Sequence, residues 1–364
     1  MLRSALGVLA AVLVSGCTGT TGPLDSGTDS GALDSGNEAD AGSDAGVDAG
    51  FDAGIDAGLA DETWTSSTHL TAATTVASGR VVEIAPGASI AVDPGVTVTV
   101  AGTLRASAVA ARATLTGTGW TGLVVAAGGH LTLDGVDLAG ATTPLDVRTG
   151  GIATVGHGTL TGATRPFAMQ AGATLSISHV TVVAASAQSD LAGAFTASYL
   201  EYQKAGGSEG LVVSDPLAEI LISDSTFSGT TTGAGDFIVS GGARHLRLEY
   251  SVVRGAHCGF HLTAVDKLEL DHVTSGGLAV SATPGDTNAW GGMFYGAGAG
   301  PHTISNCNFV DTSADIDLQG ANGTLTITNT HTGGRDTLAP SASTVFTWAS
   351  GQHAALPIAD AHPR

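Results

Sequence analysis

Polar side chains that could do chemistry recur at one position of a sequence repeat of about 22 residues. The set contains three histidines, one aspartate, one tyrosine and two asparagines: His157, His179, Asp224, Tyr250, His272, Asn306 and Asn329. Histidine and aspartate are common metal ligands, so a metal site is one interpretation. However, these residues fall at a turn in successive repeats, where stacked side-chain hydrogen bonds are their usual role. We therefore predict a structural ladder, with no metal site and no cofactor.

The position just before this set could in principle support catalysis. It is occupied by Asp134, Ser178, Ser223, Glu249 and Asp271. Glu249 and Asp271 lie one repeat apart, close enough to share a proton or a cation. Arg247 beside Glu269 instead favours a surface ion pair, worth under about 1 kcal/mol.

Two kinds of polysaccharide cleavage need more than these residues provide. Glycoside hydrolysis requires clustered carboxylates, and no such aspartate pair occurs at the expected strand. A lyase requires a base that removes a proton beside a carboxylate, with further carboxylates that hold calcium. Near Asp271 the close basic candidates are Lys267, Arg247 and Arg254. We name no catalytic residue, and a polysaccharide lyase or glycoside hydrolase stays the alternative to a non-catalytic protein.

The elements that must position these residues are short strands. Each repeat contains three segments in which apolar and polar residues alternate, such as Leu123–Val125, Leu131–Leu133 and Val136–Leu138. Alternation buries one face of a strand, and a fixed period of 20 to 50 residues indicates a stacked architecture. No segment after the N-terminal leader has a convincing helical period. The pattern predicts an all-β fold, a single-stranded parallel β-helix solenoid with three short strands per rung.

Residues 80–335 resemble the right-handed parallel β-helix, pectate-lyase-like superfamily. Ile84-Ala85-Pro86-Gly87, Val92–Val96 and Gly119-Trp120-Thr121-Gly122-Leu123 are similar to the opening coils of its secreted members. The resemblance implies a right-handed solenoid. It implies little about chemistry, because this superfamily holds lyases, hydrolases, adhesins and inert scaffolds. Asp271-His272 is similar to part of the pectate-lyase pattern, but Glu269 stands in place of its tryptophan and Arg165-Pro166 lacks the second arginine.

Two long gaps interrupt the repeat. They run from Val182 to Leu211 and from Ser275 to Met293, and both follow the third strand of a rung. We predict two loop insertions on one edge of the solenoid, with a cleft between them. Aromatic rings beside polar groups are typical of sugar recognition, although the same rings could cover the solenoid. The predicted ligand-binding residues are Tyr199, Tyr202, Trp290, Phe294, His261 and Asp317.

The N-terminal residues indicate export. Residues 1–17 have a basic start and an apolar stretch too short to span a membrane, as in a signal peptide. Leu13–Cys17 resembles the lipobox of bacterial lipoproteins, which implies cleavage before Cys17 and acylation of this residue, palmitate included. Residue Thr18 is not Asp, which in such lipoproteins favours the outer membrane. Residues 18–62 are an acidic, low-complexity tether without a basic residue.

The remaining chain divides into a solenoid domain, residues 63–337, and a C-terminal cap and tail, residues 338–364. An oxidising envelope permits a disulfide, but Cys258 and Cys307 fall in different rungs, so two buried thiols are the expectation. The tether and solenoid are both acidic within a net charge of −20, which argues against nucleic acid.

We expect an outer-membrane lipoprotein, anchored in the membrane by its N-terminal lipid and exposed to the periplasm or the cell surface. The expected partner is polysaccharide or another envelope component. A structural spacer or adhesin is a second alternative. The sequence names no specific ligand, pathway or oligomeric state.

Overall fold

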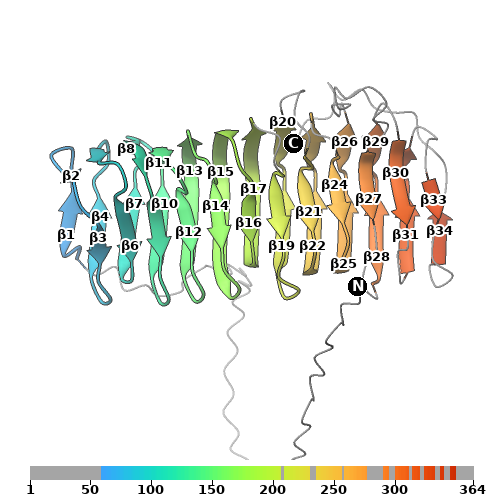
Figure 1. Ribbon diagram of the computed structural model, residues 1–364, viewed down its shortest axis with the longest axis horizontal. Coiled ribbons are helices and arrows are strands. Elements are labelled where there is room, and N and C mark those ends of the chain that lie inside the picture. The colour runs from blue at the N-terminus through green and yellow to red at the C-terminus, as the bar shows by residue number, and fades with distance from the viewer. Residues whose placement is uncertain are drawn as a thin grey trace, which may run out of the picture. The chain divides into compact units, whose positions relative to one another are not determined.

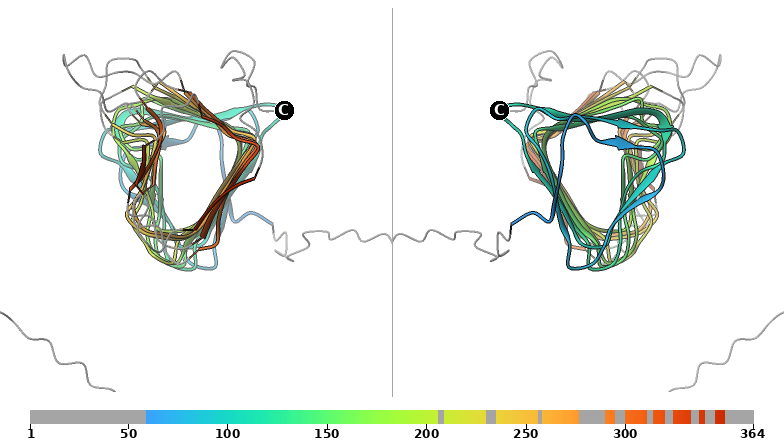
Figure 2. Two further views of the ribbon diagram at one scale, coloured as in Figure 1. Left: turned by 90° about the vertical axis from the view of Figure 1, so that its right-hand side faces the viewer. Right: turned by 90° about the vertical axis from the view of Figure 1, so that its left-hand side faces the viewer.

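The computed structural model describes residues 59–205, 209–229, 235–255, 258–276, 290–294, 300–310, 314–319, 324–332, 337–339 and 345–349. All of them belong to one compact unit, Asp56–Arg364. Every strand pairing in this unit is parallel, and successive coils stack side by side (Figure 1). Viewed along its length, the unit has three flat faces around a filled interior (Figure 2). The predicted parallel β-solenoid is confirmed.

Each face is a parallel sheet that takes one strand, or part of one, from each coil. Face 1 consists of β1 (Glu62–Trp64), β4 (Val81–Ile84), β7 (Thr103–Ser107), β10 (His130–Asp134), the first parts of β13 (Ile152–Thr161), β15 (Ala173–Ala185) and β17 (Gly193–Lys204), then β19 (Glu219–Ser223), β22 (Ala243–Glu249), β25 (Val265–Asp271), β28 (His302–Ser305), β31 (Thr324–Thr328) and β34 (Val345–Ala349).

Face 2 follows face 1 round a corner, and three long strands belong to both. It consists of β2 (His69–Leu70), β5 (Ser89–Val92), β8 (Ala113–Trp120), β11 (Val136–Ala141), the second parts of β13, β15 and β17, then β20 (Thr226–Gly229), β23 (Val252–Arg254), β26 (Thr274–Gly276), β29 (Asn308–Val310) and β32 (His331–Thr332).

Face 3 is a separate sheet that closes the coil. It consists of β3 (Thr74–Val76), β6 (Thr97–Val100), β9 (Gly122–Val125), β12 (Leu145–Val147), β14 (Phe167–Met169), β16 (Ser189–Leu191), β18 (Leu211–Val213), β21 (Ile238–Ser240), β24 (Phe260–Leu262), β27 (Trp290–Phe294), β30 (Ala314–Gln319) and β33 (Thr337–Ala339).

Stacked apolar side chains fill the interior. Alternate residues of each strand point inward, so Leu131, Ala153 and Leu175 occupy one column of face 1, and all three are buried. In the middle coils aromatic rings continue the stack, with Phe167 and Phe195 at a centroid distance of 6.0 Å. Burial of these columns is the main stabilising term of the fold.

The first predicted loop insertion is wrong, because the segment after Val182 forms a further coil of the solenoid. Strand β17 pairs along its length with β15, in a register that places Phe195 beside Leu175. This coil is shorter than its neighbours, since Gly193 lies opposite Ala173. It also places a serine, Ser189, at an interior position of face 3, where Ser189 is fully buried. Because this coil is short and has a polar interior residue, the repeat pattern of the sequence did not predict it.

The second predicted insertion lies outside the described residues between Gly276 and Trp290. The structure contains Cys258 and Cys307 as two buried thiols, as predicted. In the part of the chain that the structure describes, no helix has the length and apolar character needed to cross a membrane.

Candidate functional site

A ladder of polar residues runs along the corner between faces 1 and 2. The predicted set is present in the structure, and Tyr199 joins it. In eight successive coils, from β13 onward, one described non-glycine residue has a left-handed backbone, with φ between 46° and 54°: His157, His179, Tyr199, Asp224, Tyr250, His272, Asn306 and Asn329. We call these eight residues the corner ladder. An L-residue in this conformation costs about 1–2 kcal/mol, so stacked side chains and the two flanking strands must hold the bend.

The side chains of the corner ladder contact one another from coil to coil. The ring of His179 lies between those of His157 and Tyr199, at centroid distances of 4.8 and 4.4 Å. The rings of Tyr250 and His272 stack at 4.6 Å. Farther along, the Asn329 amide donates to the Asn306 side-chain oxygen at 2.6 Å.

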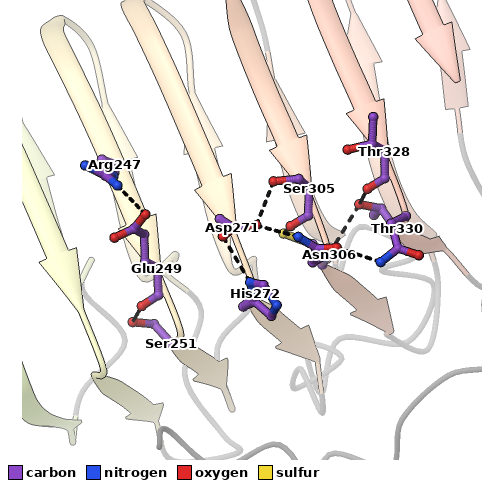
Figure 3. A network of polar contacts seen from close by, with 11 residues as sticks. Arg247, Glu249, Ser251, Asp271, His272, Ser305, Asn306, Thr328 and Thr330 are labelled. Atoms are coloured by element: carbon purple, nitrogen blue, oxygen red, sulfur yellow. Dashed lines mark hydrogen bonds and ion pairs between the residues drawn. The ribbon is translucent and has the colours of Figure 1, made fainter. Parts of the chain in front are cut away.

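Asp271 is the centre of the polar part of this ladder (Figure 3). Its carboxylate accepts hydrogen bonds from Ser305 Oγ at 2.7 Å and from Asn306 Nδ2 at 2.8 Å, and it pairs with His272 Nδ1 at 3.0 Å. Burial opposes its ionisation, but these hydrogen bonds outweigh burial and hold the pKa of Asp271 below its usual value. Glu249, the neighbour in the preceding coil, pairs with Arg247 instead. Each carboxylate therefore has its own partners, as in a structural network.

The described residues contain no group of three or more histidine, cysteine or acidic side chains arranged to hold a metal ion.

A cleft of about 430 Å³ lies on face 2 beside the corner ladder. It is lined by Tyr199, Leu200, Glu201, Gln203, Asp224, Thr226, Ser228 and Arg254. We call it the Tyr199 cleft. Its volume falls within the range of about 300–1,000 Å³ that is usual for small-molecule sites. Apart from Asp224, which lies at the corner, the lining comes from three consecutive strands, β17, β20 and β23, so the parallel register of face 2 builds the cleft.

Tyr199 forms one wall of this cleft. The residue is 44% exposed, in contrast to the fully buried Phe195 and Tyr202 of the same strand. One face of its ring stacks on His179. The next corner-ladder position is Asp224, which lines the cleft together with Tyr199. The ring is therefore held in place before any ligand binds.

A second cleft of about 400 Å³ lies on face 1 on the other side of the corner. Its outward side chains are mostly hydroxyl groups, among them Thr132, Thr154, Ser176 and Thr196, which occupy one column in register. Asp134 and His157 are the only titratable side chains among the lining residues of this second cleft.

The six predicted ligand-binding residues do not form one site. Tyr199 lies at the corner of faces 1 and 2, whereas His261, Trp290, Phe294 and Asp317 lie in β24, β27 and β30 of face 3. For Trp290, Phe294 and Asp317 the structure describes the backbone, and their register places Asp317 opposite Met293. Cys17 lies outside the described residues.

Tyr202, another of the predicted ligand-binding residues, lies in the core of the solenoid. Its side chain is fully buried, and its hydroxyl lies 3.1 Å from Ser189 Oγ and 3.3 Å from the carbonyl oxygen of Gly210. Burial raises the pKa of its phenol well above the usual value. The Tyr202 hydroxyl therefore serves as a hydrogen-bond partner for buried polar groups of its own coil.

His261 belongs to a partly buried charged cluster that the sequence analysis missed. The cluster contains Lys204, Glu209, Asp236 and His261, which the coils bring to the corner between faces 2 and 3. His261 Nδ1 lies 3.0 Å from Asp236 Oδ2, and Glu209 accepts a hydrogen bond from the backbone N–H of Asp236. Lys204 Nζ donates to the carbonyl oxygen of Gly235 at 3.0 Å.

Desolvation is the main cause of the pKa shifts in this cluster. Burial lowers the pKa of Lys204 and raises the pKa of Glu209, and the neighbouring opposite charges offset these shifts only in part. The sequence contains only two lysines, and one of them, Lys204, occupies an inward-facing position of its strand. This lysine was the sequence signal that could have revealed the cluster.

No protein-family model, curated protein or solved structure matches this chain. Its function must therefore be argued from its own geometry.

Proposed function

We propose that this protein is a non-catalytic glycan-binding solenoid of the bacterial cell envelope and that the Tyr199 cleft is its binding site. One observation carries the proposal: an exposed aromatic ring is fixed by a stacked histidine at the wall of a polar cleft. A pyranose has an apolar face, which packs on an aromatic ring, and a rim of hydroxyl groups, which need polar partners.

The polar partners are present around the ring. Glu201 and Asp224 supply carboxylate acceptors, Gln203 supplies an amide, and Thr226 and Ser228 supply hydroxyl groups. Because all of them except the corner residue Asp224 project from paired strands, little conformational entropy is lost on binding.

The sequence supports the cellular setting of this proposal. The lipobox-like Leu13–Cys17 favours acylation of Cys17 and anchoring in the outer membrane, and the acidic residues 18–62 would extend the solenoid from the membrane surface. The three-faced parallel solenoid supports a relationship to the right-handed, pectate-lyase-like superfamily. Such a relationship would not by itself indicate a function, which depends on the residues of the site.

A carbohydrate-active enzyme is the second candidate, and the Lys204–Glu209–Asp236–His261 cluster is the observation that favours it. Buried groups with shifted pKa values are frequent in active sites, although structural ion-pair networks also shift them. The cluster lies at a different corner from the Tyr199 cleft, and for this reason the non-catalytic function is preferred.

Substitution of Tyr199 by asparagine tests the proposed site. Asparagine occupies the same corner position in two other coils, at Asn306 and Asn329, so the backbone conformation is retained. Loss of the ring removes the packing of the sugar on an aromatic face. We expect an affinity about tenfold lower or more for the glycans that the wild-type protein binds, as measured by isothermal titration calorimetry after a glycan-array screen.

Tyr250→Asn is the matched control. Tyr250 is also an exposed corner-ladder tyrosine stacked on a histidine, but it does not line the Tyr199 cleft. Its substitution should leave glycan affinity unchanged. Equal losses in both variants, or no glycan bound by the wild-type protein, would contradict the proposal. Shortening of the glycan during incubation would instead favour the enzyme.

A further inference from the structure

Most of the arginines that the structure describes are neutralised by neighbouring carboxylates. Eight arginines lie among the described residues, and seven form ion pairs with aspartate or glutamate: Arg80, Arg105, Arg112, Arg148, Arg165, Arg244 and Arg247. Arg254 is the exception, since it forms no ion pair with any residue that the structure describes. This exposed guanidinium lines the Tyr199 cleft.

The parallel register places Arg254 at the far end of the cleft from Tyr199. On face 2, Gln203 lies opposite Ser228, and Ser228 lies opposite Arg254. Arg254 is therefore two coils away from β17, or about 10 Å at the usual spacing of paired strands. Ser228 and Thr226 occupy the coil between the two ends.

The two ends of the cleft differ in charge. Glu201 follows Tyr199 closely in β17, and Asp224 is the next member of the corner ladder. Glu201 accepts a hydrogen bond from Thr181 Oγ1 at 3.4 Å, and neither carboxylate pairs with Arg254 in the described structure. The Tyr199 end is thus negative, and the Arg254 end is positive.

We propose that the Tyr199 cleft binds a glycan in which a sugar with one anionic group stands next to a neutral sugar. This inference rests on the proposed glycan-binding function. The Arg254 guanidinium binds the anionic group, because its planar fork matches two oxygens of a carboxylate, sulfate or phosphate. The neutral sugar packs on the Tyr199 ring.

The same charges exclude a glycan with an anion on every sugar. A second anion at the Tyr199 end would face Glu201 and Asp224, and like charges a few ångströms apart repel one another. The cleft therefore distinguishes glycans by the spacing of anionic groups along the glycan. A high overall negative charge of the glycan does not suffice for binding.

Calorimetric titration of the full-length protein with defined oligosaccharides tests this inference. The carboxylate probe is a hyaluronate oligosaccharide, in which uronate and neutral sugar alternate. A keratan sulfate oligosaccharide and a phosphomannan oligosaccharide test sulfate and phosphate in the same way. A chitin oligosaccharide is the neutral probe, and oligogalacturonate carries an anion on every sugar. We expect at least one of the hyaluronate, keratan sulfate and phosphomannan probes to bind at least tenfold more tightly than the chitin oligosaccharide and oligogalacturonate.

Three variants assign the effect to the guanidinium. Arg254→Ala should reduce the affinity for the preferred probe at least tenfold and abolish its salt dependence, while affinity for the neutral probe stays unchanged. Arg254→Lys should restore only part of the affinity, since an ammonium group lacks the fork. Arg244→Ala, which removes an exposed arginine paired with Glu219 outside the cleft, should have no effect.

The inference would be overturned, while the proposed function stands, by an Arg254→Ala variant that binds every probe as the wild-type protein does. A preference for the neutral probe that still depends on Tyr199 would have the same consequence. Tightest binding of oligogalacturonate would also overturn it. Absence of binding to every probe and every array glycan would refute the proposed function itself, and this inference with it.

Discussion

Replacement of Phe195 by alanine is expected to destabilise the solenoid by about 3–5 kcal/mol. Phe195 is fully buried between adjacent coils, with its ring 6.0 Å from that of Phe167. Truncation leaves a cavity in a stacked interior that cannot collapse without moving the paired strands on either side. Urea denaturation followed by far-ultraviolet circular dichroism should show a large drop in the midpoint.

Thr196→Ala provides the control for this prediction. Thr196 is the next residue of β17 and points outward from face 1, so its substitution should change the free energy of unfolding by no more than about 0.5 kcal/mol. If Phe195→Ala were as mild as Thr196→Ala, residues 193–204 would not contribute to the core.

The second large effect is expected at Gly122, where the backbone of the next coil leaves no room for a side chain. Gly122 has φ +132°, and a Cβ atom at this position would overlap the carbonyl oxygen of Thr143. The overlap involves backbone atoms of a neighbouring coil, which cannot shift without breaking the sheet register. Gly122→Ala should therefore cost about 4 kcal/mol or more, measured as a drop in the free energy of unfolding.

Gly119→Ala separates this overlap from the cost of a left-handed backbone. Gly119 is three residues earlier, has φ +68°, and has open space around the position of a Cβ atom. Its substitution should cost only about 1–2 kcal/mol. Equal costs at both glycines would mean that adjacent coils are farther apart than the structure indicates.

The sequence predicted the solenoid well because each coil repeats the same pattern of buried apolar residues. Residues such as Leu131, Leu175 and Leu246 recur at inward positions of face 1, and their spacing alone indicates stacked strands. The corner ladder was also predictable, since histidine, aspartate and asparagine recur at a single turn position. Its left-handed backbone explains why these residue types stand there.

The candidate site was predicted less well because its residues depend on register. The sequence pattern treated residues 183–210 as a loop, since Ser189 interrupts the apolar column of face 3 with a hydroxyl group that bonds to Tyr202. With that coil missing, Tyr199 could not be assigned to the corner ladder, and the core residue Tyr202 was placed on the surface. Whether a described carboxylate pairs with Arg254 likewise depends on three-dimensional neighbours, which spacing in the sequence does not reveal.

The most direct test of the account is a disulfide cross-link that reports which strand lies beside β15. The structure pairs Ser176 with Thr196, whereas an insertion loop at this place would bring Leu221 beside Ser176. Neighbouring positions of paired strands are about 4.8 Å apart, within the range that a disulfide spans. Burial raises the pKa of Cys307 to about 12, so this thiol should not compete, and Cys258 is also buried.

With Cys17 changed to serine, the account predicts a rapid, near-complete cross-link in the Ser176→Cys/Thr196→Cys protein under mild oxidation and none in the Ser176→Cys/Leu221→Cys protein. A cross-link between positions 176 and 221, without one between 176 and 196, would contradict it. In that case residues 193–204 would not be a coil of the solenoid, and Tyr199 would not stand at the wall of the cleft.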